Sequence, residues 1–193
     1  MNDFLARTQE GAAALRRAVS DISAQPRLLA SVREEPAVGA GILAGVIAQV
    51  EKARTLTRPS ALGVAAVTAS HAAYAWSLYR RGARNDALGW GLRAAAWGAG
   101  VAATRSQPTS AAVAVGGAAV LATSALAGDP VLRTDAGKGM SHGANVLVAA
   151  EGLTALRAAL KQRKHKARLV CAAETGALVI GHLLLIDGLH RTR

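Results

Sequence analysis

"SALGVAAVTASHAAYAWSLY", residues 60–79, is the stretch of this sequence that decides the fold. A surface helix of a soluble protein shows a polar face at every turn, and this stretch has none. The stretch "TSAAVAVGGAAVLATSALAG", residues 109–128, has the same character. Each is 20 residues long, and about 20 apolar residues in a helix cross the hydrocarbon layer of a bilayer. Both stretches therefore predict membrane-spanning α-helices.

Four further apolar segments accompany these two, at residues 36–50, 87–104, 142–160 and 169–188. Basic or turn-forming residues separate all six segments. Together they predict an all-α fold, a polytopic helical membrane bundle of five or six apolar helices that occupies residues 36–193. The alternative is a soluble bundle with a buried, Ala-rich core, because Ala and Gly favour membrane insertion only weakly.

Residues 1–35 form a separate N-terminal segment in this prediction. A mostly apolar stripe recurs there at alternating steps of three and four residues: Leu5, Thr8, Ala12, Leu15, Val19 and Ile22. That spacing places the stripe on one face of a helix. We therefore expect an amphipathic helix that lies on a membrane or against a partner and ends before Pro26.

The first apolar segment is too short to span. Its 15 residues reach only about 22 Å, against roughly 30 Å of hydrocarbon. With six spans the two sides of the membrane carry 12 and 9 Lys and Arg residues, and with five spans they carry 14 and 7. The positive-inside rule therefore favours five spans, with residues 36–50 at the interface. It also places the N-terminus on the cytoplasmic or matrix side of a bacterial inner membrane or an organellar membrane.

The charge of the chain indicates its partners. The net charge is +11, but the basic residues lie between apolar segments and no groove-reading or base-stacking motif accompanies them, so we expect no nucleic-acid partner. Basic loops beside apolar runs attract lipids, the anionic ones above all. Small residues at four-residue steps, such as Gly41/Gly45, Gly91/Ala95 and Ala112/Gly116, predict close helix contacts and other membrane protein subunits as partners.

Ionisable residues interrupt the apolar segments. The stretch "CAAETGALVIGHLLLIDGLH", residues 171–190, contains Glu174 and His182, and the other such residues are His71, Arg93 and Glu151. A charge at the bilayer centre costs roughly 2.5–3.5 kcal/mol, so these residues should face the bundle interior and find partners. We expect Arg93 to be the counter-charge of Glu151 or Glu174. The group then forms either an ion or proton path or a structural ion pair that fixes helix register.

His71 and His182 lie in the later halves of two segments that run parallel. Two imidazoles at comparable depth predict, as one hypothesis, the axial ligands of a b-type haem. The alternative is a pair of neutral, hydrogen-bonded core histidines. No zinc-type spacing of Cys and His is present, and we expect no other metal or cofactor.

Asp129 and Asp187 end two segments and fall on the same side of the membrane. Two carboxylates at one face are able to share a hydrolytic water. The alternative for Asp129 is a turn cap before Pro130.

Two short stretches carry a resemblance to a known family. "EKARTLTRPSALGVAAV", residues 51–67, has a basic run ending in Thr-Arg-Pro before an apolar helix, and "SALAGDPVLR", residues 124–133, has a Gly-Asp helix end. Both are similar to motifs of the YhhN-type lysoplasmalogenase family of multispan membrane proteins. The resemblance implies hydrolysis of a lysolipid vinyl-ether bond, with Asp129 as one acidic site residue and Asp187 standing in for the second.

Three functions follow from these observations. Walker A, GxSxG and HExxH motifs are missing, so the first hypothesis is a membrane structural or accessory subunit without chemistry of its own. The second is an intramembrane lipid hydrolase with Asp129 and Asp187 as catalytic residues. The third is a small ion or proton transporter that uses Arg93, Glu151 and Glu174.

Overall fold

The computed structural model describes residues 34–55, 59–85, 87–159 and 164–192. Within these ranges the fold is all-α, as expected, with six α-helices, a π-helical turn and a 3₁₀ turn. The elements are α3 (Pro36–Arg54), α4 (Ala61–Arg80), α5 (Ala87–Thr104), η1 (Ala112–Gly116), α6 (Gly117–Ala127), η2 (Pro130–Leu132), α7 (Lys138–Ala159) and α8 (Lys164–Arg191). The amphipathic helix expected within residues 1–35 lies outside the described residues, apart from Glu34 and Glu35.

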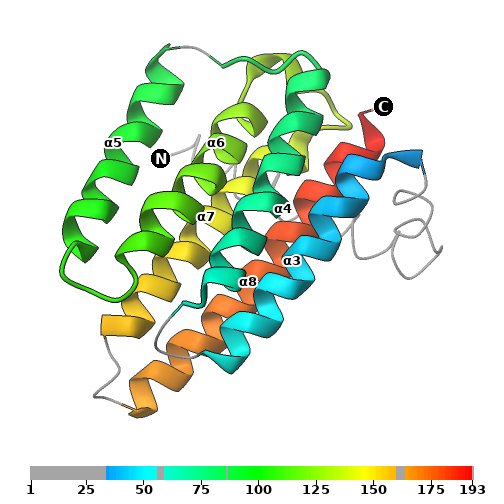
Figure 1. Cartoon of the computed structure of the whole chain (residues 1–193). Helices are drawn as coiled ribbons and strands as arrows, with labels where there is room; N and C mark the ends of the chain where they lie inside the picture. The colour runs from blue at the N-terminus through cyan, green and yellow to red at the C-terminus, as the bar shows by residue number, and fades with distance from the viewer. Residues whose placement is uncertain (1–33, 56–58, 86, 160–163, 193) are drawn as a thin grey trace.

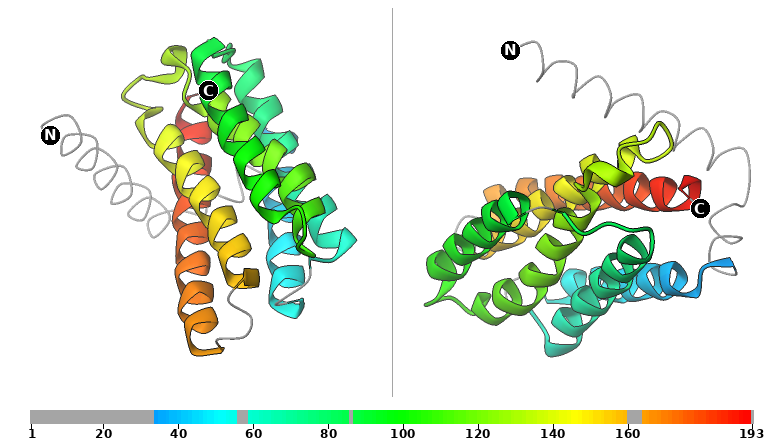
Figure 2. Two further views of the ribbon diagram at one scale, coloured as in Figure 1. Left: turned by 90° about the vertical axis from the view of Figure 1, so that its left-hand side faces the viewer. Right: turned by 90° about the horizontal axis from the view of Figure 1, so that it is seen from above.

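The helices alternate in direction from α3 to α8, each running back along the bundle (Figure 1). In two further views α5 lies at the periphery, and α7 and α8 run side by side (Figure 2). The start of α3 and the end of α8 lie at one end of the bundle. We call this the α3-start end, and the opposite end, where α3 stops and α8 begins, the α8-start end.

The first helix is longer than the apolar segment predicted for it. α3 is 19 residues long and runs antiparallel along α4, and the number of membrane spans stays a prediction. The two helices approach closely because residue 41 is glycine: a Cβ there would lie 2.7 Å from the Tyr74 ring. The Ser70 hydroxyl donates a hydrogen bond to the Gly41 carbonyl oxygen at 2.7 Å. The apolar segment 36–50 is shorter than α3 because the helix continues through a charged last turn, Glu51 to Arg54.

The predicted small-residue contacts are confirmed for two of the three pairs. Gly45 faces Ser70 and His182, and Gly116 faces Val67. Around Gly91, in contrast, a Cβ would meet nothing within 4 Å, because the residue lies on an open face of α5.

α7 and α8 approach each other closely through glycines. A Cβ on Gly143 would lie 2.7 Å from the Gly181 carbonyl oxygen and 2.7 Å from the Leu185 nitrogen. Both atoms belong to backbone, so they have no rotamer with which to move away. The same strip buries Met140, Leu147 and Leu185 completely.

One helix among those described is long and apolar enough to cross a membrane, the part of α8 from Leu169 to Arg191. α4 has the length of a span without the hydropathy, and the apolar helix Ala112–Ala127 is shorter. The two stretches that we expected to be the firmest spans therefore do not meet this criterion. α4 falls short in mean hydropathy because it contains Ser, Thr, His and Tyr among its alanines, and Ala112–Ala127 falls short in length.

Candidate functional site

Four side chains from three helices form a polar cluster in the bundle: Lys52 on α3, Glu151 and Thr154 on α7, and Glu174 on α8. The Lys52 ammonium donates a hydrogen bond to Glu151, and it lies 3.9 Å from Glu174 Oε1. Thr154 links the two charged residues, because its hydroxyl donates a hydrogen bond to Glu174 Oε1 at 2.7 Å and lies 3.4 Å from Lys52 Nζ. The side chain of Glu174 is only 4% exposed, so its charge depends on these neighbours.

The cluster corrects the predicted pairing of Arg93 with Glu151 or Glu174. The base near both carboxylates is Lys52. Arg93 instead donates to the Ser124 hydroxyl at 3.1 Å and to the Gly89 carbonyl oxygen at 3.0 Å. Ser124 in turn donates to Asn145 at 2.7 Å, so Arg93 begins a polar chain across α5, α6 and α7.

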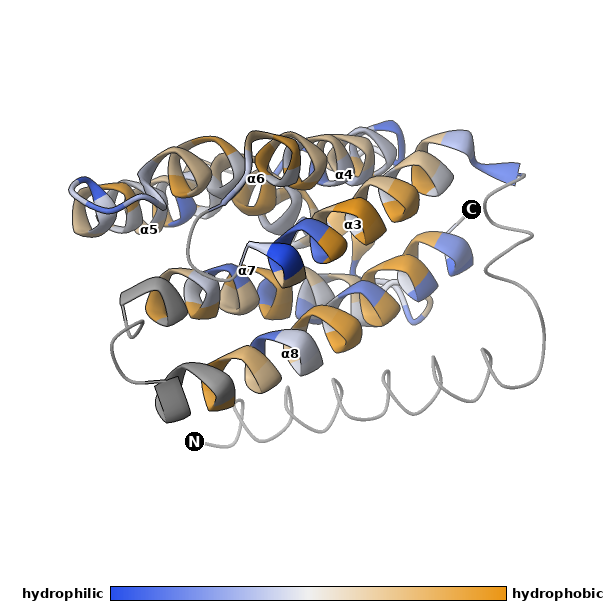
Figure 3. Cartoon of the chain, turned by 60° about the horizontal axis from the view of Figure 1, so that its bottom comes forward, coloured by the Kyte–Doolittle hydropathy of each residue, from blue (hydrophilic) through white to orange (hydrophobic). Residues whose placement is uncertain are grey.

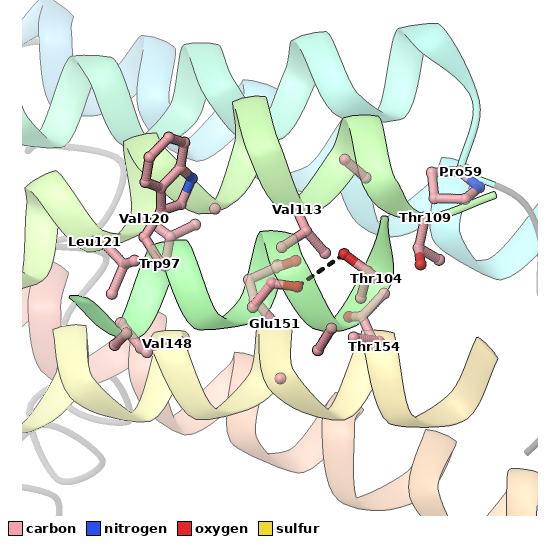
Figure 4. A pocket seen from close by; sticks show the side chains of 17 residues that line it. Pro59, Trp97, Thr104, Thr109, Val113, Val120, Leu121, Val148, Glu151 and Thr154 are labelled. Atoms are coloured by element: carbon pink, nitrogen blue, oxygen red, sulfur yellow. Dashed lines mark hydrogen bonds between the residues drawn. The ribbon is translucent and has the colours of Figure 1, made fainter. Parts of the chain in front are cut away.

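Two cavities flank the polar cluster. The smaller, of about 240 Å³, lies among α5, α6 and α7 and is lined by Glu151 and Thr154. Figure 4 shows that Trp97 and Thr104 of α5 also face it. The larger, of about 550 Å³, is a groove between α3 and α8 and is lined by Lys52 and Glu174. The cluster therefore separates two largely apolar spaces.

His71 and His182 lie at the same level, as the sequence predicted, with ring centroids 6.3 Å apart. The described contacts favour the core-histidine alternative. His71 Nδ1 lies 3.1 Å from the Thr123 hydroxyl, and His182 Nδ1 donates to the Leu178 carbonyl oxygen at 2.8 Å. A porphyrin between the rings does not fit this arrangement, because the enclosed Tyr74 ring packs 5.8 Å from His71 and 6.0 Å from His182.

The three aromatic residues near the end of α4 lie on two sides of the helix. Tyr74 is fully buried and faces α3, where a Cβ on Gly41 would touch its ring. Trp76 and Tyr79 are exposed and stack on each other, and the Arg84 guanidinium lies 3.6 Å from the Tyr79 ring centroid.

Asp129 acts as a cap. Its carboxylate accepts hydrogen bonds from the backbone N–H groups of Arg84 at 2.7 Å, of Val131 at 2.8 Å, and of Asn85. Burial alone would raise the pKa of Asp129, but these hydrogen bonds and the charge of Arg133 outweigh it and hold the pKa below its ordinary value. Asp129 therefore ties the loop after α4 to the end of α6.

Asp187, in the last turn of α8, and Asp129, directly after α6, both lie toward the α3-start end of the bundle, and the shared side of a membrane stays a prediction. The Asp187 carboxylate accepts hydrogen bonds from Arg191 Nε one turn later, at 2.9 and 3.0 Å. Each of the two carboxylates thus has a local structural role.

Sequence reasoning missed a clamp at this end. The Arg81 guanidinium donates to both oxygens of Glu35, at 2.8 and 2.6 Å, and to the Leu189 carbonyl oxygen at 2.8 Å. The hydrogen bond with Arg81 keeps the pKa of Glu35 below its ordinary value. The clamp joins the ends of α3, α4 and α8, and the only signal for it was the basic run after residue 79.

We expect Asp129→Asn to lower the free energy of unfolding by about 1–2 kcal/mol at pH 7, because one acceptor oxygen is replaced by a donor. The folded pKa lies below the unfolded one, near 3.8, so the carboxylate stabilises the fold above that pH and loses its effect as the pH falls further. Thermal unfolding of both forms between pH 7 and pH 3 measures this. A difference in melting temperature between the two forms that grows toward pH 3 would contradict the capping role of Asp129.

No protein-family profile matches the sequence, and comparisons with curated proteins and with solved structures gave no significant match. The lysoplasmalogenase resemblance therefore stays a prediction.

Proposed function

We propose that this chain is a membrane-embedded structural or accessory subunit. The observation that carries the proposal is the surface of α5, of which only Thr104 is buried. Leu88 is 70% exposed and Leu92 64% exposed on this helix, and Trp90 and Trp97 are exposed as well. A helix that turns large apolar side chains outward needs lipid or another protein beside it.

The same pattern recurs on other helices. α3 exposes Leu43, Val46, Ile47 and Val50, which at steps of three and four residues form one outward stripe. α8 exposes Leu169, Val179 and Ile180. Figure 3 shows the apolar colouring along α3 and α8. These outward stripes support several lipid-facing helices, although among the described helices α8 alone meets the length and hydropathy of a span.

The interior combines an apolar core with polar contacts between helices. Ser70 bonds to α3, His71 to Thr123 on α6, and Thr154 to Glu174 on α8. Inter-helix hydrogen bonds and small residues are the means by which membrane helices associate, because lipid supplies no hydrophobic drive between them. These contacts, together with the outward apolar stripes, support the proposed membrane bundle.

The alternation of six helices places the N- and C-terminal ends of the described chain at the α3-start end (Figure 1). With six spans, the order of the segments in the sequence assigns 12 Lys and Arg residues to that side and 9 to the other. We propose, by the positive-inside rule, that it faces the cytoplasm or matrix.

Native mass spectrometry after purification in mild detergent tests the subunit role. We expect a stoichiometric protein partner that Leu92→Trp on α5 releases and that Val46→Trp on α3 leaves bound. A chain that purifies alone, or a partner that both variants retain, would contradict a role for α5 as the partner face.

Transport of protons or ions is a second candidate, favoured by the placement of the polar cluster between the two cavities. Lys52, rather than Arg93, would then pair with Glu151 and Glu174 along the path. Glu174→Gln should alter proton flux in liposomes, and unchanged flux would count against this candidate. Lipid hydrolysis by Asp129 and Asp187 gains no support from the contacts of either carboxylate.

A further inference from the structure

The cavity among α5, α6 and α7 is lined mainly by small and apolar residues. Small residues of all three helices leave its space open, among them Gly100 of α5, Gly117 of α6 and Gly152 of α7. A Cβ on Gly152 would meet no atom within 4 Å, so the space begins directly at the backbone of α7. The volume of about 240 Å³ is slightly below the roughly 300–1,000 Å³ of sites for drug-sized ligands. The cavity therefore has the size of a small-molecule site.

Glu151 is the one ionisable residue among the described residues that line this cavity. The Lys52 ammonium donates to Glu151 Oε1 and also lies 3.9 Å from Glu174, so its charge is divided between two carboxylates. Lys52 itself lines the groove between α3 and α8 rather than this cavity. Among the described contacts no hydrogen bond reaches Glu151 Oε2, and the side chain is 23% exposed. The carboxylate therefore gives one wall of the cavity an accessible negative charge.

Four side chains of the lining carry a hydrogen-bond donor: Trp97, Thr104, Thr109 and Thr154. Each of them donates to an acceptor within the protein, at distances of 2.7 to 3.3 Å. A threonine hydroxyl has one proton, so what remains toward the cavity is the lone pairs of its oxygen. The lining thus offers acceptors and a negative charge, which match a positively charged ligand and oppose an anion.

Trp97 adds an aromatic wall to the cavity. Its indole N–H donates to the Ala114 carbonyl oxygen at 3.0 Å, which holds the ring in place. The residue remains 36% exposed, so the ring is open to an incoming molecule. Figure 4 shows Trp97 toward one end of the cavity and Glu151 nearer its middle. The face of an indole attracts a cation within about 6 Å of the ring centroid, so both residues favour the same charge.

We propose that the cavity among α5, α6 and α7 binds a small organic ammonium ion with an apolar body. Its positive charge lies at Glu151 Oε2 and the Trp97 ring, and its body fills the space beside Gly100 and Gly152. This binding site goes beyond the proposed subunit role and does not depend on it, because the cavity lies within one chain.

Two probes of the same shape isolate the charge: benzyltrimethylammonium, a cation, and neopentylbenzene, its neutral counterpart. We measure the binding of each in mild detergent from the fluorescence of Trp97, in a chain whose other two tryptophans are replaced by Trp76→Phe and Trp90→Phe. The cation should bind saturably. Glu151→Gln should weaken its binding by about tenfold and leave any binding of neopentylbenzene unchanged. No saturable response to the cation, or equal effects of Glu151→Gln on both probes, would overturn the proposal.

Gly152→Leu tests the cavity itself without removing either partner of the Lys52 pair. The leucine side chain fills the space, so the cation should no longer bind. Gly176→Leu on α8 is the matched control, because a Cβ there also meets no atom within 4 Å and the residue lies outside the cavity lining. This control should bind the cation as the parent chain does. Cation binding that survives Gly152→Leu, or that both leucine variants abolish, would overturn the site and leave the subunit role intact, since the assay contains no protein partner.

Discussion

Lys52→Met is expected to lower the free energy of unfolding by about 3 kcal/mol, because it leaves two enclosed carboxylates without the ammonium that neutralises them. The side chains of Lys52, Glu151 and Glu174 are 15%, 23% and 4% exposed, so water replaces little of the lost interaction. Unfolding in mild detergent, followed by circular dichroism against denaturant, measures the loss.

Arg54→Met is the matched control for Lys52→Met. It removes a base from the same turn of α3, but Arg54 is exposed and its pair with Glu51 spans 3.6 Å. We expect a change of less than about 1 kcal/mol. Glu174→Gln in the Lys52→Met background should restore part of the stability, because it removes one buried charge. Equal losses in the Lys52 and Arg54 variants would show that the polar cluster is not a stabilising unit.

Gly143→Ala is expected to cost about 2–4 kcal/mol, in the range of overpacked cores, since the added methyl group meets backbone atoms of α8. A Cβ at this position would lie 2.7 Å from two of them, and α7 and α8 must separate to admit it. The same denaturant titration measures the effect, and loss of the folded form altogether would agree with it.

Gly152→Ala is the control on the same helix. A Cβ at Gly152 would meet nothing within 4 Å, so only helix propensity changes. We expect a gain of about 0.5–1 kcal/mol. A loss for Gly152→Ala as large as that for Gly143→Ala would mean that close approach of α7 and α8 does not explain the role of Gly143.

The hydrophobic pattern predicted the helical fold because each apolar segment is a local property of the sequence. It also predicted that His71 and His182 share a level, since parallel segments place equivalent positions at equal depth. Segment ends were less predictable. α3 continues to Arg54. Its last turn places the Lys52 side chain inside the bundle, where the ammonium group contacts the Glu151 carboxylate.

Pairing between helices could not be derived from the pattern. Arg93 is the expected counter-charge of Glu151 or Glu174 because it lies inside an apolar segment, whereas Lys52 lies beyond the end of one. Which helices touch depends on packing at positions such as Gly41 and Gly143, where the pattern shows only small residues. The clamp of Arg81 on Glu35 joins positions 46 residues apart and has no local signature.

The central claim is that the outward faces of α3 and α8 meet lipid, and that the outward face of α5 does so in the chain reconstituted without its partner. In a Cys171→Ala background, a spin label at Ile47, Leu92 or Ile180 reports its contact with oxygen, which concentrates in lipid, and with a water-soluble nickel chelate. We predict that all three positions favour oxygen, while a label at the exposed Asp135 favours the chelate. Oxygen preference at Ile180 alone, or chelate preference at all three helical positions, would contradict a multispan membrane bundle.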